Sequence, residues 1–468
     1  MAEGSSAALN ATPNADAPRL AARLGLFDAT MIVMGGVIGS GIFVNPSVVA
    51  RQVHSAALIL SEWLIGGVLA LLGALIYAEL GARLPKVGGE YAYLRESLHP
   101  IMGFFYGWVA LLVINAGGTA AVSLVFAKYL QQLLSIPVPE RILAAATIAV
   151  LAVINCAGVR SGSNVQSALM LLRAAAVVML IVAGAGWYWH SPHAARIAWR
   201  PWLDRPASFD LASAFGSGMI PVMFSYGGYQ TANFVATEIK DPRRNLPRAL
   251  LFGAIAVVAL YVGVSFVCMA VLGPNGMAAT TTPASDVMRR TVGARGAELI
   301  AAGITISALG FLSQSVLTYP RVFFAMAADG LFPAGISRIS SRTQVPVIAI
   351  LLSSLLTVAV VLIGHYDAIL VYVESMDCLF LGLTALTLFV LRQRQRTGEA
   401  EPAFRVPGHP WTTVSFIAAN WLIVVNSSYR NRSNAGLVLG ILLAGVPLYW
   451  YWNRKSRRHR AAAITDGA

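Results

Sequence analysis

Charged residues are scarce in this chain: they make up 12% of its 468 residues, against about 25% in a typical soluble domain. Hydrophobic residues make up 57%, and the mean hydropathy is +0.67. This composition excludes a soluble globular protein and predicts a polytopic integral membrane protein.

Residues and motifs typical of metal and catalytic sites are also rare. The three cysteines, Cys156, Cys268 and Cys378, lie in apolar segments without metal-binding spacing, and the seven histidines are scattered. H-E-x-x-H, G-x-S-x-G, a Walker-type phosphate loop and a potassium-filter motif are all missing from the sequence. We therefore expect no cofactor, no metal and no enzyme activity, and a channel is only a weak alternative.

Twelve apolar runs are long enough to be membrane spans when the sequence is read with a window of about 19 residues. Their centres lie near Gly35, Leu69, Val113, Val150, Val177, Met223, Ala259, Leu309, Leu355, Leu381, Ala418 and Leu442. The sequence therefore predicts an all-α membrane protein with twelve transmembrane helices.

The net charge of +13 follows the positive-inside rule better than it fits nucleic-acid binding. With the N-terminus inside, 21 of the 34 Lys and Arg residues fall in cytoplasmic segments and 11 in external ones. No basic soluble domain is present, so we expect no nucleic-acid partner. We expect a multi-pass protein of the cell (inner) membrane with both termini cytoplasmic and a basic tail at 454–468. Residues 1–25 are expected to be a cytoplasmic tail, because they carry no signal-peptide pattern.

The first span is interrupted at its centre. Met31–Pro46 reads MIVMGGVIGSGIFVNP, with Gly39, Ser40 and Gly41 breaking an otherwise apolar helix. Unpaired backbone groups are costly in lipid, so such a break suits a protein-walled cavity, where the half-helix starting near Ile42 favours an anion. The alternative is a glycine kink that lets a neighbouring helix approach.

A second interrupted span favours the cavity. Met219–Ala236 reads MIPVMFSYGGYQTANFVA, and its expected break is Ser225–Gly228, about half the membrane region downstream. Two centrally broken helices in corresponding positions indicate an inverted-repeat transporter with a binding site near the midplane.

Three further charges lie within spans. Arg173, in the fifth span, either snorkels to the inner interface or braces the first broken helix by donating to its freed carbonyls. Glu374 and Asp377, in the tenth span, are either hydrogen-bonded structural carboxylates or part of a cavity wall. Arg321 near an inner edge is expected to pair or snorkel. A short interfacial helix is expected after Pro85, in a charged cytoplasmic loop.

Four segments together resemble the amino acid, polyamine and organocation superfamily, most closely the L-type amino acid transporters and their prokaryotic relatives. The segments are GVIGSGIF at 36–43, YAELGARLPKVGGEYAYLRE at 77–96, FSYGGYQTANFVATEIKDPRRNLPRA at 224–249 and PRVFFAMAADGLFP at 320–333. The resemblance implies a LeuT-like five-plus-five inverted repeat, alternating access, and sodium-independent movement of amino acids, often by exchange.

The resemblance also implies a set of substrate contacts. The substrate carboxylate would meet Ser40, Gly41 and Ile42, and its ammonium would meet carbonyls around Ile38, Phe224 and Tyr226. Phe224 matches an aromatic residue that closes over the substrate. The full predicted set is Ile38, Ser40, Gly41, Ile42, Phe224, Ser225, Tyr226, Gly227 and Gln230.

Two positions depart from the pattern of these relatives. Arg173 stands where they typically have Lys, in the place of a sodium ion used elsewhere in the fold. Because Arg does not readily release a proton, this favours sodium-free exchange over a proton relay. Cys378 stands where relatives often have a bulky aromatic residue, so Cys378 and Gly118 are expected in the cavity wall beside space for a larger side chain, unless a neighbouring rotamer fills it.

The expected partners are an amino acid substrate and membrane lipid. The animal relatives join an ancillary glycoprotein through a cysteine between the third and fourth spans, and the corresponding loop here, 135–141, has none. We therefore expect no covalent ancillary subunit.

The expected organisation is a first repeat at 26–190, a second repeat at 191–391 and the last two spans with a preceding basic loop at 392–453. The expected function is sodium-independent exchange of neutral L-amino acids. The alternatives are proton-coupled uptake of a cationic amino acid or amine, suggested by Glu374 and Asp377, and a non-transporting amino acid sensor.

Overall fold

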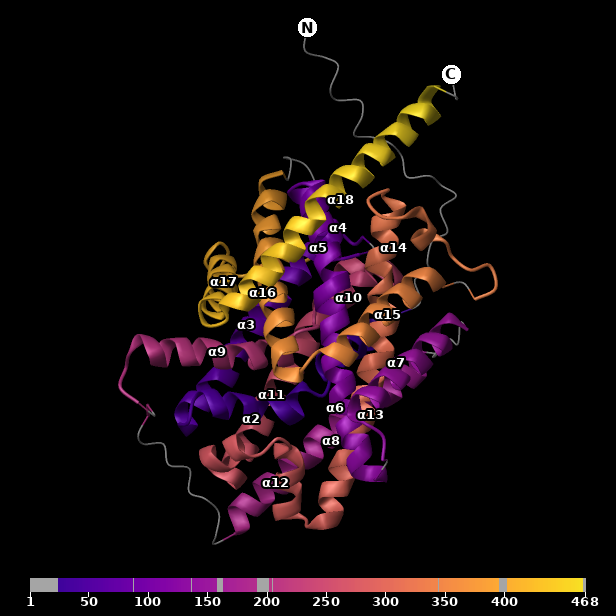
Figure 1. Ribbon diagram of the computed structural model, residues 1–468. Helices are drawn as coiled ribbons and strands as arrows, with labels where there is room; N and C mark the ends of the chain where they lie inside the picture. The colour runs from indigo at the N-terminus through magenta and orange to yellow at the C-terminus, as the bar shows by residue number, and fades with distance from the viewer. Residues whose placement is uncertain are drawn as a thin grey trace.

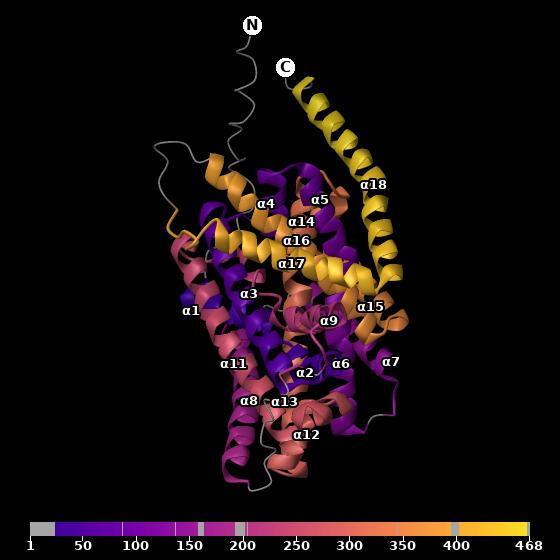
Figure 2. The same cartoon turned by 90° about the vertical axis from the view of Figure 1, so that its left-hand side faces the viewer.

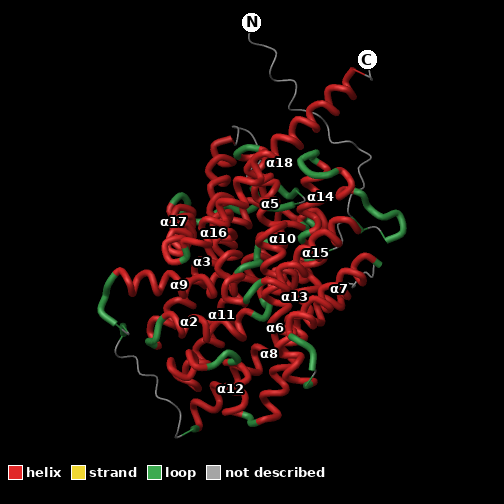
Figure 3. The backbone as a smooth tube through the Cα atoms, in the orientation of Figure 1, coloured by secondary structure: helices red, strands yellow, loops and turns green. Residues whose placement is uncertain are grey.

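The computed structural model describes residues 24–86, 88–135, 137–157, 163–191, 202–203, 205–343, 345–394 and 402–465. Within these ranges the chain is built from helices joined by loops and turns (Figure 3). Apart from its last two residues, the predicted tail at 1–25 lies outside them.

The first half of the chain contains α1 (Leu26–Val37), α2 (Gly41–Gln52), α3 (Ala56–Arg83), α4 (Glu90–Ser97), α5 (Pro100–Val109), the π-helix η2 (Ala110–Asn115), α6 (Ala116–Leu134), α7 (Glu140–Cys156) and α8 (Ser163–His190). The second half contains α9 (Phe209–Tyr226), α10 (Thr231–Phe234), the 3₁₀ turn η3 (Ala236–Glu238), α11 (Pro242–Ala279), α12 (Pro283–Thr291), α13 (Ala294–Thr318), α14 (Pro320–Ala328), η4 (Ala334–Ser337), α15 (Val347–Ile363), α16 (Tyr366–Arg394), α17 (Trp411–Arg430) and α18 (Arg432–Thr465).

All twelve predicted span centres lie within these helices. Seven helical stretches of the described residues are long and apolar enough to cross a membrane: Leu26–Gln52, Ala56–Arg83, Pro100–Leu134, Met170–His190, Pro242–Ala279, Ala294–Ala328 and Tyr366–Arg394. The prediction of an all-helical membrane protein is confirmed. The count of twelve spans and the two repeats stay predictions.

The first broken helix consists of α1 and α2, which are separated by Ile38–Ser40. Ile38 leaves the helical region with φ −73° and ψ 83°, and Ser40 is the N-cap of α2. In the most apolar 18-residue window of Leu26–Gln52, 94% of the residues are buried inside the protein. The freed backbone groups therefore face protein, as the cost of exposing them to lipid requires.

The second broken helix consists of α9 and α10, and its break is Gly227–Gln230. The expected start of this break, at Ser225, was wrong by two residues. The N–H of Gly227 donates to the carbonyl of Met223 at 2.7 Å, so α9 continues through Tyr226. Gly228 has φ +98°, a conformation that favours glycine.

The two breaks touch each other at glycines. A Cβ on Gly228 would lie 2.2 Å from the carbonyl oxygen of Gly36, and a Cβ on Gly36 would lie 2.5 Å from Oγ1 of Thr231. Any larger residue at either glycine would overlap the opposite segment. This contact fixes the end of α1 against the start of α10.

Long helices enclose the two breaks. α1 packs against α8, α11 and α13, and α2 packs against α9 and α11. α16 packs against both α6 and α9. In Figure 2, α17 lies across the face of α16, and α18 runs along one side of the molecule.

The molecule has two ends along the direction of the long helices. In Figures 1 and 2, α4, α5 and the last turns of α18 lie toward one end, here called the α4 end, and α12 lies toward the other, the α12 end. The backbone of Leu24 pairs with the chain beside Ile239, so the start of α1 lies next to η3.

One further expectation was wrong. The short helix after Pro85 is α4, but six of its eight residues are buried, so it is inserted into the protein and is not an interfacial helix. Within the predicted basic tail at 454–468, α18 continues as far as Thr465. Its Ala- and Arg-rich sequence has high helix propensity and extends a helix that has already formed.

Candidate functional site at the two helix breaks

A cavity lies between the two broken helices. It is lined by Gly36, Val37, Gly39, Ser40 and Gly41 of the first broken helix, by Phe224, Ser225, Gly227, Gly228, Gln230 and Thr231 of the second, by Ile114, Gly118 and Val122 of η2 and α6, by Phe311, Gln314, Ser315, Thr318 and Tyr319 of α13 and its end, and by Val373, Glu374 and Asp377 of α16.

The N-terminus of α2 forms one side of this cavity. Ser40 is its N-cap, and the Ser40 hydroxyl makes no capping hydrogen bond. Gly41 also lines the cavity. The first N–H groups of a helix have no intrahelical partner and carry partial positive charge, so this side of the cavity favours an anion such as a carboxylate.

Side chains from three helices hold the end of α1. Arg173 Nη1 donates to the carbonyl of Gly35 at 3.1 Å, and the Tyr261 hydroxyl donates to that of Val37 at 3.0 Å. Ser307 Oγ donates to the carbonyl of Gly39 at 3.3 Å. These three hydrogen-bonded carbonyls alternate along the chain with the carbonyls of Gly36 and Ile38.

Arg173 is buried between α1 and α13, with 1% of its surface exposed. The guanidinium packs against Gly310, where a Cβ would lie 1.8 Å from Arg173 Nη2. Its Nε has no hydrogen-bond partner among the described residues. Burial excludes snorkelling, because a snorkelling guanidinium must reach water, so Arg173 takes the bracing position against α1.

The opposite charge lies on α16. Glu374 and Asp377 are one helical turn apart, are 2% and 6% exposed, and both line the cavity. The Cys378 thiol donates to Glu374 Oε1 at 3.3 Å, and the Gln230 side chain hydrogen-bonds to Asp377. These two carboxyl groups are therefore part of the cavity wall.

Gln230 connects the acidic wall to the second break. Its Oε1 accepts from the N–H of Gly228 at 3.0 Å, while its side chain also contacts Asp377. Gln230 thus satisfies one backbone donor freed by the break and positions one carboxyl group.

Asn45 of α2 contacts Ser225, which lines the cavity. Its Nδ2 donates to the carbonyl of Pro221 at 2.9 Å and to Ser225 Oγ at 2.8 Å. The Tyr366 hydroxyl donates to Asn45 Oδ1 at 3.1 Å. One buried amide therefore joins α2, α9 and α16 beyond the cavity.

The α4 end has its own contacts. Arg321 Nε lies 3.2 Å from Glu238 Oε1, so Arg321 pairs, which was one of its two expected positions. The N–H of Leu24 donates to the carbonyl of Glu238 at 3.0 Å. The start of α1, η3 and α14 are thus held together.

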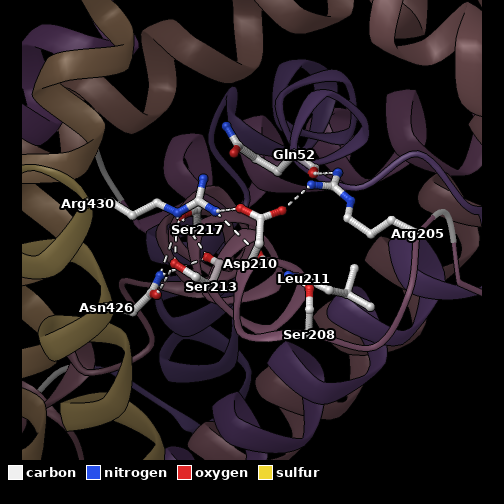
Figure 4. A network of polar contacts seen from close by, with 9 residues as sticks. All are labelled: Gln52, Arg205, Ser208, Asp210, Leu211, Ser213, Ser217, Asn426 and Arg430. Atoms are coloured by element: carbon white, nitrogen blue, oxygen red, sulfur yellow. Dashed lines mark hydrogen bonds and ion pairs between the residues drawn. The ribbon is translucent and has the colours of Figure 1, made fainter.

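A polar network ties the first turn of α9 to other segments (Figure 4). The Asp210 carboxylate binds Arg205 at 2.8 Å and Arg430 of α17 at 3.3 Å. Arg430 Nε also donates to Ser213, and Arg205 reaches the carbonyl of Gln52 at the end of α2. Asp210 is mostly exposed, so this network adds little to stability but links the ends of α2, α9 and α17.

Comparison with known proteins identifies the family. Residues 24–442 match the family model of the amino acid permeases. The chain belongs to the amino acid permease family. It is therefore a membrane transporter of the amino acid, polyamine and organocation superfamily and not an enzyme.

The permease is similar to several transporters of known activity. It is 30% identical over 448 residues to the large neutral amino acids transporter small subunit 2 of Rattus norvegicus, covering 93% of this chain and 82% of that one. It is 30% identical over 441 residues to the serine/threonine exchanger SteT of Bacillus subtilis, covering 91% and 96%. It is 28% identical over 448 residues to the Asc-type amino acid transporter 1 of Mus musculus, covering 93% and 82%.

Most of the predicted contact residues of the permease lie at the cavity. Ser40, Gly41, Phe224, Ser225, Gly227, Gln230 and Gly118 line it. Ile38, Ile42, Tyr226 and Cys378 do not. Ile38 and Ile42 point their side chains into the core, and the Tyr226 hydroxyl donates to the carbonyl of Trp63. The Cys378 thiol donates to Glu374 of the cavity wall, and its own place in that wall stays a prediction.

Sequence reasoning missed the contribution of α13 and of Asn45. Gln314, Ser315 and Thr318 line the cavity from α13. Small polar residues within an apolar span were the available signal. In the local sequence, Asn45 looks like any polar residue near the end of a span. Its role could not be predicted, because its three hydrogen-bond partners come from distant segments.

Proposed function

We propose that this permease exchanges neutral L-amino acids across the membrane without sodium, by alternating access around the cavity at the two breaks. One observation carries the proposal: the N-terminus of α2, the end of α1 and the end of α9 all face the same cavity. Together they offer backbone donors and backbone acceptors to one small zwitterion.

The amino acid backbone fits this polarity. Its carboxylate would meet the N–H groups of Ser40, Gly41 and Ile42 with the Ser40 hydroxyl, and its ammonium would meet carbonyls around Ile38, Phe224 and Tyr226. Helix N-termini attract anions and C-terminal ends attract cations, so only one orientation of the zwitterion is favourable. Ile42 and Tyr226 would take part through their main chains. Phe224 would close over the substrate.

Arg173 supports sodium independence. It supplies a fixed positive charge against α1, where other members of the fold use a sodium ion. Arginine also keeps its proton over the physiological range, so it gives no proton relay.

Exchange follows from the cost of an empty site. A cavity lined by unpaired backbone groups and two carboxyl groups is poorly stabilised when no substrate satisfies it. The return step without substrate is therefore slow, and a bound amino acid speeds it. The exchanger named among the relatives supports this reading.

The proposed setting is the cell membrane, with the α4 end cytoplasmic. Leu24 lies beside η3, and Glu238 of η3 pairs with Arg321 of α14, which packs against α5. The last turns of α18 lie toward the same end (Figure 1). The described cysteines are buried or partly buried, which supports a transporter without a covalent partner.

The test uses purified permease in sealed liposomes preloaded with a mixture of unlabelled amino acids. Uptake of each labelled neutral amino acid is followed without sodium and without a proton gradient, beside empty liposomes. Uptake only into loaded liposomes is expected. Equal uptake into empty liposomes would contradict exchange, and stoichiometric binding without accumulation would indicate a sensor.

A second candidate is proton-coupled uptake of a cationic amino acid or amine. The placement of Glu374 and Asp377 in the cavity wall favours it, because buried carboxyl groups in a transport path are suited to carry protons. Uptake that collapses with a protonophore and falls in Asp377→Asn would support this candidate over sodium-free exchange.

A further inference from the structure

The helix α3 carries a buried carboxyl group that lies outside the substrate cavity. Glu62 is 0% exposed, and it does not line the cavity at the two breaks. Neither of its carboxyl oxygens has a hydrogen-bond partner among the described residues. Buried polar groups are nearly always hydrogen-bonded, so a buried carboxyl group without a partner requires an explanation.

The carboxyl group lies directly against α9. A Cβ on Gly218 would lie 2.2 Å from Glu62 Oε2 and 2.4 Å from Oε1, so the glycine gives the group its room. A second polar side chain on this half of α9 is satisfied: Asn426 of α17 donates to the Ser213 carbonyl at 3.1 Å and accepts from the Ser213 hydroxyl at 2.8 Å. Glu62 contacts α9 without any such hydrogen bond.

Among the described residues, no cation neutralises the Glu62 carboxyl group. The helix α3 packs against α2, α9, α11, α16 and α17. The charged and titratable groups that these helices bring nearest to Glu62 along their length are Arg51 of α2, Asp210 and Tyr226 of α9, Tyr261 and Cys268 of α11, Glu374 and Asp377 of α16, and Arg430 of α17. The two cations in this set have other partners, since Arg51 donates to the Thr280 carbonyl and Arg430 binds Asp210.

The packed position of α9 therefore requires a proton on Glu62. An ionised carboxylate without a partner is highly unfavourable in a low-dielectric interior, whereas the neutral acid costs much less. A separation of α9 from α3 would admit water to the carboxyl group, and the group would release its proton to that water. Because the packed arrangement holds one more proton than the separated one, a rise in pH favours separation.

The contact at Glu62 begins a row of close contacts between α3 and α9. One turn further along both helices, a Cβ on Gly66 would lie 2.2 Å from Val222 Cγ1. The two helices thus run side by side in the same direction, with a glycine at each of these two levels. Because the glycines let the helices approach closely, a change at Glu62 alters the distance between them.

The same row of contacts reaches the cavity. One more turn along α9, the Tyr226 hydroxyl donates to the carbonyl of Trp63 at 3.1 Å. Phe224 and Ser225, just before Tyr226, line the cavity. A displacement of α9 from α3 therefore moves residues of the candidate site.

We propose that Glu62 is a proton-binding site outside the substrate cavity, which holds α9 against α3 while it is protonated and frees α9 when it loses the proton to water. The pH then sets how often the half-helix that carries Phe224 and Ser225 is free to move. This goes beyond the proposed function, because the proton is not carried with the substrate and no proton gradient is involved.

The test measures amide hydrogen exchange of residues 211–226 in the purified permease at pH 6 and pH 8, corrected for the intrinsic pH dependence of amide exchange. In the wild type, the corrected rate is expected to rise at least about tenfold, because the release of one proton shifts the equilibrium by up to about tenfold per pH unit. Glu62→Gln keeps the size of the protonated side chain but cannot ionise. Its corrected rate is expected to change by less than about threefold and to stay near that of the wild type at pH 6.

Asp210→Asn is the matched control, because Asp210 is a mostly exposed carboxyl group of α9 itself. This variant is expected to keep the pH response of α9. Glu62→Asp, which retains an ionisable group at the same position, is also expected to keep it. Folding of each variant is checked by gel filtration and thermal unfolding.

Two results would overturn the proposal. One is a wild-type segment 211–226 whose corrected hydrogen exchange is the same at both pH values, and this result needs no variant. The other is a pH response that persists in folded Glu62→Gln, which would assign the response to another group. Amino acid exchange in preloaded liposomes decides the proposed function separately: if no amino acid is exchanged, that function fails, while the hydrogen exchange of α9 still decides the role of Glu62.

Discussion

Arg173 is a single buried charge that holds the end of α1 at the first helix break. Its guanidinium donates to the Gly35 carbonyl, which the end of α1 leaves without an intrahelical partner. Gly310 gives it room, since any side chain there would overlap the guanidinium. The charge is thus part of the structure of the break.

We expect Arg173→Ala to lower exchange at least about tenfold, because the buried Gly35 carbonyl loses its donor and α1 loses its brace. Arg173→Lys is expected to retain part of the activity, because it keeps the charge. Arg430→Ala, which breaks an exposed ion pair with Asp210, is the control and should change stability by under about 1 kcal/mol. Full exchange by a folded Arg173→Ala protein would contradict the role given to this residue.

Glu90 is a second residue whose importance only the folded chain reveals. It lies on α4, outside the candidate spans, and is fully buried. The hydroxyls of Tyr77 and Tyr106 both donate to its carboxyl group. Burial raises the pKa of Glu90 to about 7, although these two hydrogen bonds act to lower it.

Among the described residues, no ion pair joins Glu90 to a cation. Asp377 of α16 acts on it as a like charge, and Tyr93 and Tyr229 add hydroxyls. The basic side chains of the neighbouring elements are engaged elsewhere: Arg95 with Asp329, Arg392 with Glu79, and Arg394 with the Glu96 carbonyl.

The raised pKa predicts a pH dependence of stability. Between the ordinary pKa of 4.5 and about 7, the folded protein holds a proton that the unfolded chain has released, so stability falls as pH rises through this window. The fall is about 3 kcal/mol at most. Thermal unfolding of Glu90→Gln at pH 5 and pH 8 should lack this component, and an identical pH dependence in wild type and variant would refute it.

At the scale of the elements, the breaks in α1–α2 and α9–α10 depend on contact between glycines. Gly36 and Gly228 let two backbones approach so closely that neither tolerates a Cβ. Because α10 is only four residues long, its position depends on this contact and on the packing around it. The cavity exists because both breaks occur at the same depth and touch.

Gly228→Ala is expected to destabilise the permease by at least about 2 kcal/mol and to abolish exchange, because of its positive φ and its overlap with Gly36. Gly440→Ala in α18, where a Cβ meets nothing within 4 Å, is the matched control and should keep exchange. Thermal unfolding and exchange are measured on both. Normal exchange by Gly228→Ala would mean that the two segments separate more easily than the contact implies.

At the scale of the whole molecule, orientation follows from which charges gather at each end. α4 carries Arg95 and is contacted by Lys86 and Arg394 through Glu96, whereas α12, at the other end, carries Arg289 and Arg290. The larger share of Lys and Arg at the α4 end predicts that this end is cytoplasmic.

Single cysteines test this orientation. On a background in which the partly exposed Cys156 is replaced by alanine, a membrane-impermeant thiol reagent added to intact cells should label Arg289→Cys but not Lys86→Cys. Lys86→Cys should be labelled only after permeabilisation. The reverse pattern would place the α4 end outside and contradict the proposed orientation.

Much of the fold was readable from the sequence because membrane spans are local signals. Runs such as Ala56–Arg83 need no partner to be recognised, and the Gly-Ser-Gly interruption at 39–41 breaks a helix by its own composition. The second break was placed two residues too early. Its position depends on Gly228, whose backbone contacts Gly36 of another segment. The sequence of one segment alone does not reveal such a contact.

By itself, the sequence determined that the chain is a helical membrane protein and which two helices are broken, and it left Arg173 either snorkelling or bracing the first broken helix. Each of these follows from backbone and charge costs that act within a short stretch of chain. Only the tertiary structure decided that Asn45 joins α2 to α9 and α16, that the Cys378 thiol donates to Glu374, and that α4 and Glu90 are buried. Those outcomes depend on which distant side chains satisfy a buried polar group, and this is fixed only when the helices pack.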